Sequence, residues 1–359
     1  MSPVVRQFIV GAARSDAITT MALDVHRELS ASTQSELYAY HSPEESLAHV
    51  VHNRHELPTG APEDLFVYHS SYGIPDLTRL VRERTEKLVL VYHNITPSDR
   101  YWDYDPDFAA ALEWGRRELE LIRPKVVRAV ADSRYNADEL TEIGYEGVTV
   151  IPAGMNPYRL SNILIDTKFN RELGEHFPDG FILFVSQSIP HKRVELAMEV
   201  VHLLRSVHRM NVGLVVAGPQ RNSKYKNVID AFREKLPEAH VLMAGEVTES
   251  MLATLYRRAI LLLGTSDHEG LGNPPLEAMA EGCPVVIRGC GAVPDTVGSG
   301  GIVLPPDAGV LEITEATAAV INSPEMQLGL SAAGRTRVGR FMDESRRVSI
   351  VDVLREVMA

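Results

Sequence analysis

The stretch from Ala259 to Val286 reads AILLLGTSDHEGLGNPPLEAMAEGCPVV, and it decides the fold. The run AILLLGT is continuously apolar, which is typical of a strand buried on both faces of a parallel sheet. Pro274 suits the first turn of a helix, where its missing N–H needs no partner. Gly282 is suited to end that helix. The apolar run that follows predicts a second strand, so the stretch reads as one strand–loop–helix–strand unit.

The same alternation of apolar runs and helical spacing extends along the whole chain, for example in the helical pattern of residues 16–29. Strands are predicted at 4–11, 64–69, 87–93, 126–132, 147–154, 180–187, 212–218, 240–245, 259–265, 283–289 and 301–306. Strands that alternate with helices form parallel sheets. The sequence therefore predicts an α/β protein.

The pattern restarts after a polar stretch at residues 156–179, which predicts two Rossmann-like domains. We expect the first at residues 1–165 and the second at 166–340. A terminal amphipathic helix within 341–359 is expected to pack back towards the N-terminal domain. Ligands of such sheets bind at the carboxyl ends of the strands, so both domains are expected to face a central cleft.

Composition narrows the class of protein. The 359 residues carry a net charge of −12 and neither half is basic, which disfavours nucleic acid as a main ligand. We find no apolar run near the ~18 residues of a membrane span, so membrane association is not indicated. Two cysteines, Cys283 and Cys290, form no disulfide framework. A reducing cytoplasm is the expected location.

The loop before the helix carries the groups of a binding site. Glu269 lies at its mouth, where a carboxylate accepts hydrogen bonds from sugar hydroxyls, and Glu277 lies one turn into the helix, where it suits a ribose diol. Free amides at a helix N-terminus favour a diphosphate or sugar hydroxyls. The loop residues concerned are Gly270, Leu271, Gly272 and Asn273. These residues alone leave open that both carboxylates merely complement the helix dipole.

The stretch resembles the signature of the retaining glycosyltransferases of group 1, the GT4 family, which have the GT-B fold. That signature has two glutamates separated by seven residues, followed by EAMAxGxPVV. The matching positions are Glu269, Gly270, Gly272, Pro274, Glu277, Ala278, Met279, Ala280, Gly282, Pro284, Val285 and Val286. The resemblance implies that Glu269, with the loop amides, holds the donor sugar, and that Glu277 holds the nucleotide ribose.

A second segment, residues 184–196 (FVSQSIPHKRVEL), is similar to the family element whose Arg and Lys bind the diphosphate. Lys192 matches the Lys, whereas Gln187 stands where the family has Arg. Arg193 or Arg14 is a candidate replacement. The resemblance also places Val247 near the nucleobase. The alternative for Lys192 and Arg193 is a solvated basic pair.

In the first half, His93 ends a predicted strand, and it matches a family histidine that faces the donor sugar. His69 matches a neighbouring strand end more loosely. The family has a glycine-rich loop near the donor phosphates after the first strand, and this sequence has a single glycine there, Gly11. The alternatives are structural histidines and an ordinary turn.

The segment from Asn94 to Trp102 is the expected acceptor side, because the rings of Tyr101 and Trp102 suit stacking on a sugar. A partly buried aromatic anchor is the alternative. The nearby Asp103, Asp105 and Asp107 are reminiscent of a metal–diphosphate motif, but acidic residues before a helix also serve as caps. We expect no metal site and no cofactor.

The resemblance implies a hexosyltransferase that moves a sugar from a UDP- or GDP-sugar to an acceptor hydroxyl with retention of configuration. The expected role is polysaccharide or glycoconjugate synthesis. The acceptor would be a saccharide, a lipid-linked saccharide or a small molecule. The alternatives are a nucleotide-sugar epimerase or a sugar phosphorylase of the same fold, and a catalytically degenerate partner subunit.

Overall fold

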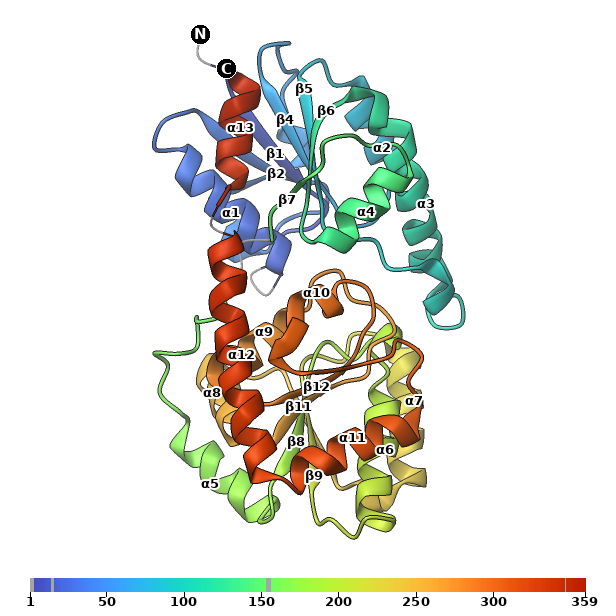
Figure 1. Ribbon diagram of the computed structural model, residues 1–359. Helices are drawn as coiled ribbons and strands as arrows, with labels where there is room; N and C mark the ends of the chain where they lie inside the picture. Colours follow the sequence, from blue (N-terminus) through green and yellow to red (C-terminus); the bar gives the residue numbers. More distant parts are fainter. Residues whose placement is uncertain (1–2, 14–15, 153–155, 346) are drawn as a thin grey trace. The chain divides into compact units, whose positions relative to one another are not determined.

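The computed structural model describes residues 3–13, 16–152, 156–345 and 347–359 (Figure 1). The chain divides into two compact units. The first contains residues 1–99, 106–155 and 344–359, and the second contains residues 100–105 and 156–343. The boundary predicted at residue 165 therefore lies inside the second unit, because the polar stretch from residue 156 onwards already belongs to it.

The first unit is built on a parallel sheet in the order β3-β2-β1-β4-β5-β6-β7, seven strands within the described residues. The strands are β1 (Val5–Ile9), β2 (Ser35–Ala39), β3 (Val51–Asn53), β4 (Leu65–Ser70), β5 (Lys87–Tyr92), β6 (Val126–Ala131) and β7 (Thr149–Val150). The predicted strands are present, but that of residues 147–154 is only two residues long. The short strands β2 and β3 were not predicted, because neither has a sustained apolar run.

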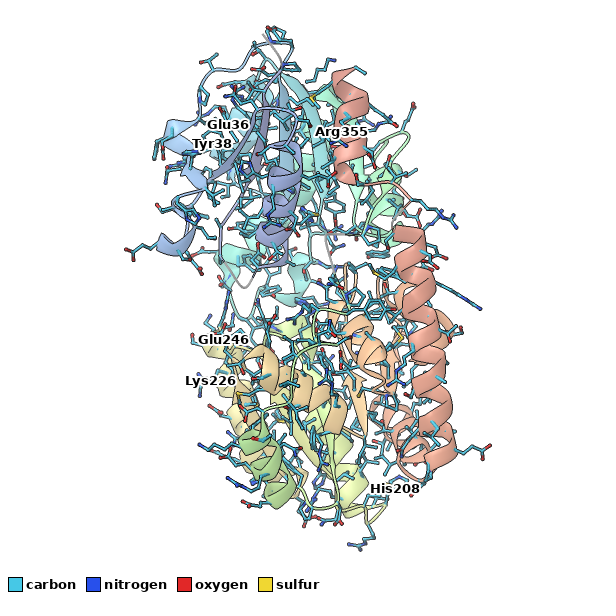
Figure 2. The ribbon with its side chains drawn as sticks, turned by 90° about the vertical axis from the view of Figure 1, so that its left-hand side faces the viewer. Glu36, Tyr38, His208, Lys226, Glu246 and Arg355 are labelled. Carbon is cyan, nitrogen blue, oxygen red and sulfur yellow. The ribbon has the colours of Figure 1, made fainter. Side chains whose placement is uncertain are left out.

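Helices cover both faces of this sheet. They are α1 (Ala17–Leu29), α2 (Pro75–Glu83), α3 (Pro106–Ile122), α4 (Arg134–Glu142) and α13 (Ile350–Met358). The Asp16 carboxylate accepts the amide N–H of Thr19 (2.9 Å) and so caps α1. Helices α1 and α13 bury their apolar faces in one core with the valines of β1, β4, β5 and β6. Arg355 of α13, labelled in Figure 2, lies 3.9 Å from Glu28 of α1.

The second unit repeats the architecture, with six parallel strands in the order β10-β9-β8-β11-β12-β13 among its described residues. These are β8 (Phe181–Val185), β9 (Gly213–Ala217), β10 (Val241–Gly245), β11 (Leu261–Gly264), β12 (Val285–Arg288) and β13 (Ile302–Leu304). The helices that begin in this unit are α5 (Thr167–His176), α6 (Val194–Ser206), α7 (Ser223–Lys235), α8 (Glu249–Arg258), α9 (Asn273–Glu281), α10 (Val293–Val297), α11 (Val310–Ile321) and α12 (Pro324–Ser345). Helices α6, α7 and α11 share one core with the sheet.

In both sheets the strand order reverses once, between β1 and β4 and between β8 and β11. Open parallel sheets bind ligands at such a reversal, outside the carboxyl ends of the strands. The loops that leave β8 and β11 lie at this position in the second unit. The α/β prediction with two Rossmann-like sheets is confirmed. Among the described residues, no helix is both long enough and apolar enough to cross a membrane.

Candidate functional site

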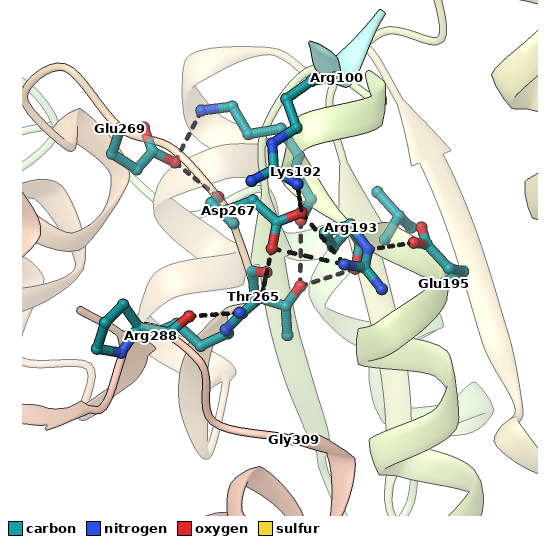
Figure 3. A network of polar contacts seen from close by, with 12 residues as sticks. Arg100, Lys192, Arg193, Glu195, Thr265, Asp267, Glu269, Arg288 and Gly309 are labelled. Atoms are coloured by element: carbon teal, nitrogen blue, oxygen red, sulfur yellow. Dashed lines mark hydrogen bonds and ion pairs between the residues drawn. The ribbon is translucent and has the colours of Figure 1, made fainter. Parts of the chain in front are cut away.

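The loop after β11 holds Glu269 in a defined position (Figure 3). Lys192 Nζ, from the loop after β8, donates to Glu269 Oε1 at 2.7 Å, and Ser266 Oγ donates to the same oxygen at 2.7 Å. The Lys192 and Glu269 side chains are 16% and 15% exposed. The pair is thus ordered by the protein and still reachable from solvent.

The backbone at Glu269 is fixed by a close approach. The Ala292 N–H donates to Glu269 O at 2.9 Å. Gly291 has a φ of +53°, and a Cβ on it would lie 2.1 Å from Glu269 O. Only glycine fits there. The turn between β12 and α10 therefore fixes the backbone of Glu269.

The N-terminus of α9 follows this loop as predicted. Gly272 precedes the helix with a φ of +91°, and Gly282 ends it with a φ of +80°. The Thr296 hydroxyl donates to Leu271 O at 2.6 Å, which ties the loop to α10. Asn273 Oδ1 is buried and has no hydrogen-bond partner among the described residues.

Asp267, two residues before Glu269, is the centre of an arginine cluster (Figure 3). Arg288 Nη1 lies 2.6 Å from Asp267 Oδ1, while Arg193 Nη1 lies 3.1 Å and Arg100 Nη1 3.4 Å from Asp267 Oδ2. The Asp267 side chain is 8% exposed. One buried carboxylate thus orders three guanidinium groups beside the Lys192–Glu269 pair.

Arg193 forms ion pairs with two carboxylates, those of Asp267 and Glu195. Its Nε donates to Glu195 Oε1 at 2.5 Å, and its backbone has a φ of +55°. Burial lowers the pKa of Arg193, but the hydrogen bond and charge of Glu195, with those of Asp267, outweigh burial and raise it above the usual range. The guanidinium of Arg193 is therefore already paired with two carboxylates of the protein, Glu195 and Asp267, before any diphosphate binds. Gln187 is exposed, and Arg14 lies outside the described residues.

Glu277 is held by two partners. Arg159 Nε donates to Glu277 Oε1 at 2.7 Å, and the Tyr256 hydroxyl donates to Oε2 at 3.0 Å. Arg159 Nη1 also donates to Glu249 Oε1 at 2.9 Å. Burial and then the charge of Glu277 raise the pKa of Tyr256 well above its usual value, so the hydroxyl stays a donor. A carboxylate accepts about four hydrogen bonds, so capacity for a diol remains on Glu277.

The residues predicted for the acceptor side belong to different units of the chain. Tyr101 and Trp102 belong to the second unit, and Asn94 belongs to the first. Tyr101 is 4% exposed, and its hydroxyl lies 3.1 Å from His191 Nδ1. It is an aromatic anchor, whereas Trp102 is 45% exposed and keeps an open ring. Val247 is half-buried just after β10.

A second polar arrangement crosses the sheet of the first unit. His69 Nδ1 lies 3.0 Å from His93 Nε2, and His93 Nδ1 lies 2.8 Å from Asp132 Oδ2. On its other side, His69 Nε2 lies 3.1 Å from Gln7 Oε1. The planes of the two histidine rings are nearly parallel, with an interplanar angle of 3°. Burial and then the neighbouring His93 hold the pKa of His69 well below its usual value.

His93 does not present its ring to solvent. The side chain is 2% exposed although the residue as a whole is only half-buried, so the accessible part of His93 is backbone. The next residue, Asn94, has a φ of +76° and donates through Nδ2 to Asn136 Oδ1 (2.9 Å) and Glu139 Oε2 (3.0 Å). Gly11 lies in the loop after β1, and a Cβ there would meet nothing within 4 Å.

Sequence reasoning did not single out several residues of these arrangements. They are Gln7, Asp132, Arg159, Ser266, Asp267 and Arg288. Gln7 and Asp132 each lie two residues beyond a core valine on the same face of a strand, a pattern that is visible in the sequence. The pairing of Arg159 with Glu277 joins residues far apart in the chain and has no local signal. Among the described residues, no group of three or more His, Cys, Asp or Glu is arranged to hold a metal ion.

Comparison with known proteins identifies relatives of this chain. Residues 166–337 match the family model described as glycosyl transferases group 1. The MMP alpha-(1->4)-mannosyltransferase of Mycolicibacterium hassiacum is 26% identical over 268 residues, which cover 70% of this chain and 60% of that protein. The O-antigen chain mannosyltransferase B of Escherichia coli is 29% identical over 128 residues, 36% of this chain and 33% of the relative.

The fold has a counterpart among solved structures. Anabaena HepE in complex with UDP and glucose superposes with a TM-score of 0.77 at 14% sequence identity, covering 98% of this chain and 99% of that one. The alignments with the first curated relatives span only 33% and 26% of their lengths. The family match and the fold together make the chain similar to group 1 glycosyl transferases.

Proposed function

We propose that this chain, a glycosyltransferase of the group 1 type through its residues 166–337, moves a hexose from a nucleotide diphosphate sugar to an acceptor hydroxyl with retention of configuration. The observation that carries the proposal is the Lys192–Glu269 pair, at 2.7 Å, beside the strand-order reversal between β8 and β11. Glu277 lies one turn into the helix that follows.

Lys192, Glu269 and the amides at the start of α9 would each play a different role in the transfer. Lys192 offers three N–H donors and gives one to Glu269, so others remain for the diphosphate as negative charge builds on the leaving group. Glu269 keeps its second oxygen for sugar hydroxyls. The amides at the start of α9 add donors at the positive end of the helix. This stabilisation requires no bound metal.

The glutamine at position 187 removes a cation from the expected diphosphate site. The arginine cluster on Asp267 supplies positive charge nearby: three guanidinium groups surround one carboxylate, and Glu195 pairs with one of them. We propose that this cluster contributes to the field on the diphosphate in place of the missing arginine. Its residues Arg193 and Arg100 are 38% and 42% exposed, within reach of solvent and ligand.

The names of relatives support a choice of donor sugar to test. Curated relatives of this chain are named mannosyltransferases, and a structural neighbour holds UDP and glucose. We therefore propose a hexose on UDP or GDP, with mannose tested first. The proposed acceptor is a saccharide or a lipid-linked saccharide, in polysaccharide or glycoconjugate synthesis.

Isothermal titration calorimetry with UDP, GDP, dTDP and ADP tests the donor site on the wild type, on Glu277→Ala and on the control Glu325→Ala, an exposed glutamate of α12. One nucleotide is expected to bind the wild type and the control alike. Loss of the ribose contact should weaken it by about tenfold or more in Glu277→Ala. Absence of binding by all four would reject the donor site and favour a degenerate partner subunit.

Stereochemistry is tested separately. With the nucleotide known, the matching sugar donors are incubated with candidate acceptors, and the anomeric configuration of the product is read by NMR. Retention is expected. An inverted product would reject that part of the proposal and leave the donor site standing.

A further inference from the structure

The six residues from Arg100 to Asp105 belong to the second unit, although the residues directly before and after them belong to the first. The carbonyl of Tyr101 accepts the N–H groups of Tyr104 at 2.9 Å and of Asp105 at 2.7 Å, so the segment forms a closed turn. We call it the 100–105 turn. The rings of Tyr101 and Tyr104 extend from this one hydrogen-bonded segment, and both contact residues of the second unit.

The first contact reaches the loop that carries Lys192. This loop follows β8 and spans residues 186–193, up to the start of α6. The Tyr101 hydroxyl lies 3.1 Å from Nδ1 of His191, the residue directly before Lys192. Tyr101 and His191 are 4% and 6% exposed, so the contact is shielded from water. The tyrosine therefore fixes a ring that lies one residue away from the lysine.

The second contact reaches the other end of the same loop, where α6 begins. The ring of Tyr104 packs edge-on against that of Tyr225 in α7, with 5.5 Å between the centroids. The Tyr225 hydroxyl accepts the N–H of Val194, the first residue of α6, at 2.8 Å. Arg193, which precedes the helix, makes no capping bond with its side chain. Tyr225 therefore satisfies a free amide at the helix start, two residues after Lys192.

The loop after β11 holds the backbone of the same residues (Figure 3). Thr265 Oγ1 donates to the carbonyls of Lys192 at 3.1 Å and of Arg193 at 2.8 Å. The Asp267 N–H donates to the carbonyl of His191 at 2.8 Å. These bonds fix three consecutive carbonyl groups. The side chain of His191 and the start of α6 are held by the 100–105 turn and its contacts.

The contact between Tyr101 and His191 joins two uncharged groups. Burial and then the charge of Asp105 raise the pKa of Tyr101 above its usual value. Burial and then the charge of Lys192 hold the pKa of His191 well below its usual value. Removal of the tyrosine hydroxyl therefore removes a hydrogen bond and changes no charge beside Lys192.

We propose that Tyr101 and Tyr104 are positioning residues that hold Lys192 in the donor site through the residues on either side of it. This inference rests on the proposed function, in which Lys192 binds the diphosphate. All the groups concerned belong to the second unit. The buried ring of Tyr101 is not accessible for stacking on an acceptor sugar, so this tyrosine acts on the donor side instead.

Hydrogen exchange of the full chain, followed by mass spectrometry, tests the ordering of the loop without any ligand. The readout is a peptide that covers residues 188–196, in which the N–H groups of Lys192, Arg193 and Val194 are hydrogen bonded. In Tyr101→Phe this peptide should exchange about fivefold faster than in the wild type, because the loop loses one hydrogen bond. Peptides of α12 should exchange as before, because the change is local.

Tyr40→Phe is the matched control, because it removes the hydroxyl of a half-buried tyrosine in the first unit. It should leave the exchange of residues 188–196 unchanged. Tyr104→Ala is a second variant, which removes a half-buried ring and its contact with Tyr225, and the same peptide should again exchange faster. Wild-type exchange in Tyr101→Phe would overturn the inference. If that variant does not fold, Tyr104→Ala decides in its place.

Calorimetry then relates the loop to the donor site, with the nucleotide that binds the wild type among UDP, GDP, dTDP and ADP. Tyr101→Phe should raise its Kd about fivefold. In a Lys192→Ala background the same change should have no effect, because the tyrosine acts through the lysine. An unchanged Kd, or an equal loss of affinity in both backgrounds, would contradict the positioning role. If no nucleotide binds the wild type, the proposed donor site is rejected, and the exchange of residues 188–196 still decides whether the turn holds the loop.

Discussion

Gly291 fixes the position of the Glu269 backbone through a contact that admits no side chain. A Cβ at its φ of +53° would lie 2.1 Å from Glu269 O. We therefore expect Gly291→Ala to shift the loop and lower the affinity for the donor nucleotide sugar by about tenfold or more. Binding of the complete sugar donor by calorimetry measures this.

The matched control is Gly329→Ala, a helical position of α12 where a Cβ meets nothing within 4 Å. That change should leave binding unaltered and raise stability slightly, because alanine restricts the unfolded chain. Equal binding by both variants would show that the loop tolerates the displacement and that Glu269 is not held by this turn.

The position of a single residue could be predicted from the sequence where it follows from local structure. Glu269, Gly272 and Glu277 belong to one strand–loop–helix unit, so their places follow from spacing. Arg159 was missed because its partner, Glu277, lies 118 residues further along the chain. Arg288 was missed because an arginine ending an apolar strand gives no sign that a buried carboxylate receives it.

Among the elements, β4, α2 and α3 are joined by Glu118. Its fully buried carboxyl accepts hydrogen bonds from the hydroxyls of Tyr68 and Thr78. Burial raises the pKa of Glu118 to about 7, with the two hydroxyls opposing that rise. The folded state therefore binds a proton that the unfolded chain releases near its ordinary pKa of 4.5.

This raised pKa predicts a stability change with a definite sign. The contribution of Glu118 is fully present below about pH 4.5 and is lost as pH rises through about 7. The free energy of unfolding should fall by about 3 kcal/mol across that interval. Glu118→Gln should remove the dependence, whereas the exposed Glu113→Gln on the same helix should keep it. Urea unfolding at a series of pH values measures this, and an unchanged slope in Glu118→Gln would contradict it.

Arg159 connects the segment before α5 to α8 and α9 through Glu249 and Glu277. We expect Arg159→Ala to raise the nucleotide Kd by about tenfold, because the loss of a charged hydrogen bond leaves Glu277 less well oriented. Arg171→Ala, at an exposed site of α5, is the control. Tighter binding in Arg159→Ala would instead mean that the arginine competes with the ribose.

The success of element prediction followed the strength of the apolar pattern. Strands β8 to β13 each carry an apolar run and were all found. Strand β2 begins with Ser35 and Glu36, and Figure 2 shows Glu36 with its neighbour Tyr38 on that strand. The hydroxyl of Tyr38 donates to Glu36 at 3.1 Å. Such polar pairing stabilises a strand without leaving an apolar signature.

For the whole molecule, the last helix completes the core of the first unit. Leu354 of α13 is fully buried in that core. We expect Leu354→Ala to destabilise the protein by about 2–5 kcal/mol, as large-to-small core substitutions do. Leu328→Ala, at a position of α12 that is 73% exposed, should change stability by less than about 0.5 kcal/mol. Thermal unfolding distinguishes the two, and similar melting temperatures would show that α13 is dispensable.

The six residues from Arg100 to Asp105 have a consequence for recombination between related enzymes. They come from the N-terminal half of the sequence but belong to the second unit, where Tyr101 bonds His191 and Tyr104 packs edge-on against Tyr225. A chimera joined only near residue 156 would combine residues 100–105 of one protein with the second unit of another. The contacts of Tyr101 with His191 and of Tyr104 with Tyr225 would then be made between residues of different parents. Genetic exchange of either half must therefore preserve a matched hexapeptide, which restricts the crossovers that yield a folded hybrid.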